Sequence, residues 1–121
     1  MRFRPDILTT LTLPAGPVEL DEAGFLVNPD LWTKDFAEHI AQGENITLTS
    51  QHWEIIAFMR DSLAEHGVAI DVRHVLKLLQ NQQNISKSAA KQQLFNLFPY
   101  GYVKQACKIS GMKQPRAWST G

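Results

Sequence analysis

The sequence predicts a mainly α-helical protein: a small orthogonal bundle of about five helices with an N-terminal β-hairpin. A length of 121 residues suits one domain around one hydrophobic core. After residue 30, apolar residues recur every three to four positions in most of the chain, which is typical of amphipathic helices. We therefore expect a single domain over residues 1–121, made of a hairpin (17–28), a helical bundle (30–110) and a C-terminal arm (111–121).

The predicted hairpin is the stretch PVELDEAGFLVN, residues 17–28, in which apolar and polar residues alternate around a turn. Val18 and Leu20 can pair with Phe25 and Val27 across the Asp-Glu-Ala-Gly sequence, whose glycine tolerates a positive φ. Asn28-Pro29-Asp30 then ends the strand and begins a helix that continues to Gly43.

The second helix, residues 50–66, has the widest apolar side and is expected at the centre of the core, with Trp53 as an anchor. Asp71 caps a third, short helix that continues to Leu79, and the QNQQN stretch (80–84) is predicted to be a connecting loop. The boundaries of the last two helices come from capping residues, prolines and glycines. They predict a fourth helix from Ser86 to near Pro99 and a fifth from Gly101 to Ser110, ended by Gly111.

Charge is distributed unevenly along the chain, although the formal net charge is zero. The first 71 residues contain all twelve acidic residues and four basic ones, a net charge of −8, and the remaining residues carry +8 with no acidic residue. Either the two halves neutralise each other in the fold, or the basic half forms a face for an anion: nucleic acid, an acidic protein or a small oxyanion.

Composition and motifs exclude several classes of protein. No apolar run is long enough to cross a membrane, and prolines interrupt the N-terminal segment before a signal-type apolar region develops. The single cysteine excludes an internal disulfide and favours a cytoplasmic protein, and the four histidines lack metal-ligand spacing, so no metal site and no cofactor are expected. Phosphate-binding glycine motifs and nucleophile elbows are absent, so no classical catalytic constellation is predicted.

Two features of the sequence could carry a function. Cys107 is either an inert, partly buried residue or a reactive thiol, because neighbouring lysines favour the thiolate whereas its position late in a helix opposes it. The helices at 50–66, 71–79 and 86–97 could form a helix-turn-helix group, with Lys87 and Lys91 on a recognition face for nucleic acid.

Three stretches, GFLVNPDLW, ITLTSQHWEIIAFMRD and LFPYGYVKQACKISGMKQP, resemble the DsrC/TusE family of sulfur-relay proteins, which includes the gamma protein of dissimilatory sulfite reductase. The resemblance covers about residues 17–116. It implies a small helical protein whose C-terminal arm carries sulfur as a cysteine persulfide between partner proteins. As an enzyme, such a protein is a sulfurtransferase or sulfur carrier.

The resemblance also assigns candidate site residues. Cys107 matches a second cysteine found in many members, and Trp118 stands eleven residues later, where the family has its principal sulfur carrier. Arg73, Lys77 and Lys104 coincide with basic residues that would bind an anionic sulfur species or the arm, and Tyr102 replaces an expected proline.

These observations predict an accessory or regulatory partner in a sulfur relay, with Cys107 as the candidate persulfide carrier and with sulfur-transfer or sulfite-reductase-type proteins as partners. The alternative is a helix-turn-helix nucleic-acid-binding regulator that uses the basic C-terminal half.

Overall fold

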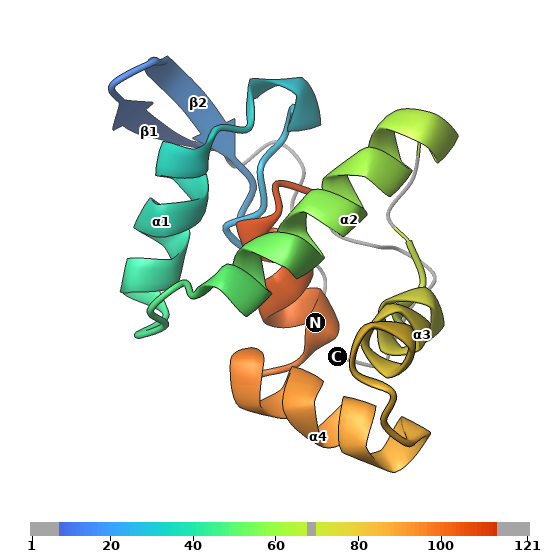
Figure 1. The fold of residues 1–121 in the computed structure, drawn as a ribbon. Coiled ribbons are helices and arrows are strands. Elements are labelled where there is room, and N and C mark those ends of the chain that lie inside the picture. Colours follow the sequence, from blue (N-terminus) through green and yellow to red (C-terminus); the bar gives the residue numbers. More distant parts are fainter. Residues whose placement is uncertain (1–7, 68–69, 114–121) are drawn as a thin grey trace.

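The computed structural model describes residues 8–67 and 70–113 and confirms a mainly helical fold with an N-terminal antiparallel hairpin. Figure 1 shows α2 crossing the middle of the molecule, with the hairpin and α1 on one side and α3 and α4 on the other. The elements follow in the order β1 (Thr9–Leu13), β2 (Gly16–Leu20), a 3-10 turn η1 (Pro29–Leu31), α1 (Lys34–Gly43), α2 (Ser50–His66), α3 (Val72–Gln83), α4 (Lys87–Leu97) and η2 (Tyr102–Cys107).

The hairpin lies earlier in the chain than predicted. β2 pairs with β1, with Leu11 opposite Val18, and the predicted partner strand contributes only an isolated bridge between Leu20 and Leu26. The predicted turn does form, since the Gly24 amide donates to the Asp21 carbonyl, but it connects β2 to a short extended segment. The prediction of a hairpin over residues 17–28 is therefore wrong in its pairing, because the threonine-rich stretch before it supplies the partner strand.

The first predicted helix is divided in two. The Asn28 side chain accepts a hydrogen bond from the Asp30 amide and begins η1, which ends at Trp32. Thr33 then caps α1 by accepting from the Phe36 amide at 3.1 Å. Because of the break at residues 32–33, the Trp32 side chain is not part of α1 and binds the last helix instead, where it donates to the Ile109 carbonyl.

α2 has the predicted bounds, but in its first turn His52, and not Trp53, is the buried residue. His52 is 5% exposed, whereas Trp53 is only partly buried. The Thr49 amide donates to His52 Nδ1 at 3.0 Å, so the proton lies on Nε2, which donates to the Leu97 carbonyl at 2.8 Å. The imidazole thus caps α2 and binds the end of α4, which explains why the polar residue is the buried one.

α3 is longer than predicted, because the QNQQ residues form its last turn and only Asn84 leaves the helix, in a left-handed conformation. The predicted loop at 80–84 is therefore wrong, since glutamine is a good helix former and the stretch contains no glycine or proline. α4 begins after the predicted Ser86 cap, which accepts from the Ala89 amide, and ends two residues before Pro99.

The last helix begins as a π-helix, η2, and ends in an α-helical turn before Gly111, which has φ +74°. Its Gln105 side chain is fully buried and binds two neighbours: it accepts from the Tyr100 amide at 2.9 Å and donates to Glu44 at 3.2 Å. These two bonds attach the last helix to the preceding turn and to the end of α1.

One large hydrophobic cluster joins the helices, and a smaller one lies beneath the hairpin. α2 contributes Ile55, Ile56 and Met59 to the large cluster, as expected of the central helix. None of the helices in the described residues is long and apolar enough to cross a membrane.

Candidate functional site

Cys107, the candidate sulfur carrier, lies at the end of η2 and is 0% exposed. It belongs to the large hydrophobic cluster together with its neighbours Ala106 and Ile109. A buried thiol in apolar surroundings cannot contact a partner's sulfur atom without movement of the helix or its neighbours. Of the two alternatives left by the sequence, this geometry favours the inert cysteine.

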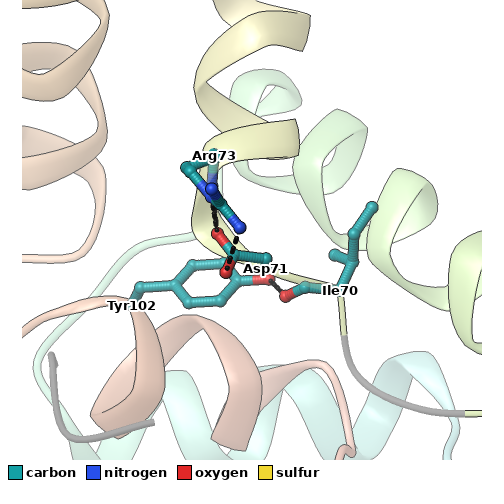
Figure 2. A network of polar contacts seen from close by, with 4 residues as sticks. All are labelled: Ile70, Asp71, Arg73 and Tyr102. Atoms are coloured by element: carbon teal, nitrogen blue, oxygen red, sulfur yellow. Dashed lines mark hydrogen bonds and ion pairs between the residues drawn. The ribbon is translucent and has the colours of Figure 1, made fainter.

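The π-helical geometry brings Tyr102 next to Cys107. The two residues are five positions apart, which is also the spacing of hydrogen bonds in a π-helix, so they share one face of η2. Their side chains are hydrogen-bonded to each other, and the Tyr102 hydroxyl donates to the Ile70 carbonyl at 2.6 Å. Figure 2 shows this hydroxyl beside Ile70, with Asp71 and Arg73 above the ring. Tyr102 therefore connects the helix that contains Cys107 to Ile70, just before the start of α3.

Burial also determines the protonation state of this pair. Desolvation raises the pKa of Cys107 to about 12, and the hydrogen bond with Tyr102 lowers it only in part. Desolvation likewise raises the pKa of the Tyr102 hydroxyl far above its ordinary value, with a smaller contribution from Cys107. Both groups are protonated at neutral pH, and a protonated thiol is a poor nucleophile.

Arg73, one of the predicted anion-binding residues, is already paired with an acid. Its Nε lies 3.1 Å from Asp71 Oδ1, and the Arg73 backbone amide donates to the same oxygen at 2.8 Å. These hydrogen bonds lower the pKa of Asp71, and the bond from the Arg73 backbone amide has the largest effect. The guanidinium is largely exposed, with 78% of its side chain accessible, so it can contact an anion only in competition with Asp71.

The other predicted residues do not form one pocket with the thiol. Lys77 is exposed one helical turn after Arg73 on the same face of α3. Lys104 is exposed on η2, whereas Cys107 on the same segment faces the core. Trp118 lies outside the described residues. In the described part of the chain, no group of three histidine, cysteine or acidic side chains could hold a metal ion.

Sequence reasoning missed the role of Tyr102. A spacing of five is not a helical contact in an ordinary α-helix, where neighbours are three or four apart, so only the π-helix makes it meaningful. The only signal in the sequence was the substitution of tyrosine for the proline that the family resemblance led us to expect.

Comparisons with known proteins define the class of this protein. A family model described as "DsrC like protein" matches residues 14–117. The sulfurtransferase TusE homolog of Haemophilus influenzae is 38% identical over 98 residues, which cover 81% of this chain and 89% of that protein. The sulfurtransferase TusE of Escherichia coli K12 is 35% identical over the same shares. The crystal structure of the oxidized gamma-subunit of the dissimilatory sulfite reductase (DsrC) from Archaeoglobus fulgidus matches with a TM-score of 0.79 and 32% identity, over 91% of this chain and 99% of that one.

The fold and these relatives define a small helical sulfur-relay protein. The family model covers more than half of the chain, and the relatives align over most of their own length. The chain belongs to the DsrC/TusE family. The alternative of a helix-turn-helix nucleic-acid-binding regulator finds no support among these relatives.

Proposed function

We propose that this protein is an accessory or regulatory partner in a sulfur relay, which binds relay proteins but does not itself carry sulfur on Cys107. The observation that carries the proposal is the state of this thiol, which is fully buried, hydrogen-bonded to Tyr102 and protonated at neutral pH. A relay residue must become a thiolate and reach the donor sulfur, and Cys107 meets neither requirement in this structure.

The family resemblance adds a second argument. Position 118, where the resemblance places the principal carrier, is a tryptophan, which has no nucleophilic sulfur. A chain with the family fold but without a reactive thiol at that position can occupy the partners' binding surfaces without transferring sulfur. The chemistry of the relatives points to sulfur-transfer or sulfite-reductase-type proteins as the partners. A cytoplasmic location is part of this proposal, since it keeps a lone thiol reduced.

The experiment compares wild-type protein with Trp118→Cys after incubation with inorganic polysulfide. A thiolate attacks the polysulfide, an S–S bond breaks, and the shortened polysulfide leaves with the bonding electrons, so the protein gains one sulfur atom. We expect intact-protein mass spectrometry to show no gain for the wild type and a gain for Trp118→Cys. Trp118→Ser is the matched control, since it removes the indole without adding a thiol.

A second measurement tests partner binding. An excess of wild-type protein should slow sulfur transfer through Escherichia coli TusE if the two proteins compete for the same relay partners. The proposal is wrong if wild-type Cys107 gains a sulfur atom that it then gives to cyanide as thiocyanate, because Cys107 would then be a carrier in its own right.

A further inference from the structure

The last helix ends in a complete set of hydrogen bonds. The final four carbonyls of a helix have no partner within it, and here they belong to residues 107–110. The Met112 amide donates to the Cys107 carbonyl at 3.0 Å, and the Gly111 amide donates to the Lys108 carbonyl at 3.2 Å. This is the Schellman pattern, in which a residue with positive φ reverses the chain after the helix.

The remaining two carbonyls are bound by side chains that are distant in sequence. Trp32 Nε1 donates to the Ile109 carbonyl at 3.0 Å, and Arg60 Nη1 donates to the Ser110 carbonyl at 3.2 Å. The two donors also contact each other, since the Arg60 guanidinium carbon lies 4.7 Å from the centroid of the Trp32 ring. We call Trp32 and Arg60 the exit clamp, because the chain leaves the helix beneath them.

The exit clamp is attached to other parts of the fold. Arg60 projects from α2, and its Nη2 donates to the Pro29 carbonyl in η1 at 3.0 Å. Burial lowers the pKa of Arg60, whereas the Asp30 carboxylate acts in the opposite direction and favours the charged form. One guanidinium thus connects η1, α2 and the end of the last helix.

Gly111 fits closely under this clamp. A Cβ at this position would overlap Trp32 Cδ1 and lie 2.9 Å from Trp32 Cβ, and the φ of +74° is one that other residues rarely adopt. Met112 is then 0% exposed, and Lys113 is the first exposed residue after the helix. The path of the chain from Gly111 to Lys113 is therefore fixed beneath the clamp.

We propose that Trp32 and Arg60 are positioning residues for the C-terminal arm, because they fix the place and direction of the chain at Lys113, from which the arm continues. A segment that must reach a partner's binding site gains from a fixed point of origin, because its effective concentration at that site depends on where it starts. The purpose of the exit clamp rests on the proposed function, in which the C-terminal arm contacts relay partners. The geometry of the exit clamp can be tested without any partner.

The test measures distances between spin labels by pulsed electron paramagnetic resonance. One label is placed at Lys113→Cys and the other at Ser88→Cys, exposed on α4, and the buried Cys107 stays unlabelled. We expect a narrow distance distribution in the background protein. Trp32→Phe keeps the ring over Gly111 but removes the N–H donor, so the distribution should broaden.

Matched variants make the result specific. Arg60→Lys keeps the charge but cannot donate to two carbonyls in the same fork geometry, so it should broaden the distribution as well. Trp53→Phe, at a partly buried tryptophan away from the exit, should leave it unchanged. A second label pair, Thr10→Cys with Ser88→Cys, reports on the body and should not change in any of these variants.

Two results would overturn the proposal. A distribution that is equally narrow with and without the clamp would show that Trp32 and Arg60 do not fix the exit. Broadening of the body pair in the clamp variants would show that these residues hold the fold together and not the arm. Neither result depends on sulfur loading, so this proposal and the proposed function can fail separately.

Discussion

The buried thiol of Cys107 gives a direct prediction about pH dependence. Burial raises the pKa of Cys107 to about 12, so the thiolate fraction stays low at neutral pH and increases only as the pH approaches that value. The alkylation rate with iodoacetamide at pH 7 should therefore be well below that of the unfolded chain, whose cysteine titrates near an ordinary value of about 8.5. A pH–rate profile of the folded protein with an apparent pKa below 7 would contradict this.

Tyr102 should stabilise the fold through its hydroxyl. Tyr102→Phe leaves the Ile70 carbonyl without this donor and removes the hydrogen bond to Cys107, so we expect a loss of about 1–3 kcal/mol in the free energy of unfolding. Denaturant titration measures the loss. Tyr100→Phe is the control, because Tyr100 is 70% exposed and its hydroxyl can be replaced by water contacts.

At the scale of elements, α2 is the helix on which the core depends. Met59 is 0% exposed at its centre, so Met59→Ala should cost about 2–5 kcal/mol by leaving a cavity. Trp53→Ala should cost less than the roughly 3–5 kcal/mol of a fully buried aromatic residue, because Trp53 is only partly buried. Denaturant titration of both variants checks the order, and a larger loss for Trp53→Ala would contradict it.

Local signals predicted where two of the helices begin. Asp71 and Ser86 cap helices as the sequence indicated, because capping depends on residues within one turn. The hairpin was predicted with the wrong partner, because strand pairing depends on residues farther apart and the turn at Asp21 to Gly24 was mistaken for the centre of the hairpin.

The candidate site was predictable only in part. The sequence identified Cys107 as the candidate reactive residue but could not decide whether its side chain is buried. Lysines flank Cys107 in the sequence, whereas apolar residues surround it in space. The contact with Tyr102 needs the π-helix, and the Arg73–Asp71 pair needs the start of α3, so neither could be derived from periodicity alone.

At the scale of the whole molecule, the charge division along the sequence is in part a division in space. The helices α3 and α4 lie on the opposite side of α2 from α1 and the hairpin (Figure 1), and they carry Arg73, Lys77, Lys87 and Lys91. The last helix differs, since its Lys108 Nζ lies 5.7 Å from the centroid of the Phe25 ring. Arg73 pairs with Asp71 at the start of α3, and the lysines of α3 and α4 are exposed. This side of the molecule therefore presents a positive potential to the solvent.

This separation predicts unusual chromatography for a protein of zero net charge. At pH 7 and low salt it should bind a cation exchanger through the exposed lysines of α3 and α4. Salt should release it as the Debye length falls from about 30 Å at 0.01 M to about 10 Å at 0.1 M. Lys91→Gln should elute earlier than Lys34→Gln on α1, although both change the net charge equally, and identical elution would contradict the prediction.

The two bonds of the His52 ring have a consequence for the order of folding. One bond, to Thr49, is local and can form as soon as α2 begins to wind, whereas the other, to Leu97, joins residues 45 positions apart and requires the assembled fold. The local bond orients the imidazole before its distant partner arrives. Substitutions that weaken only the distant bond should therefore accelerate unfolding and leave the folding rate nearly unchanged. In this order of events, α2 forms early and His52 binds the Leu97 carbonyl late.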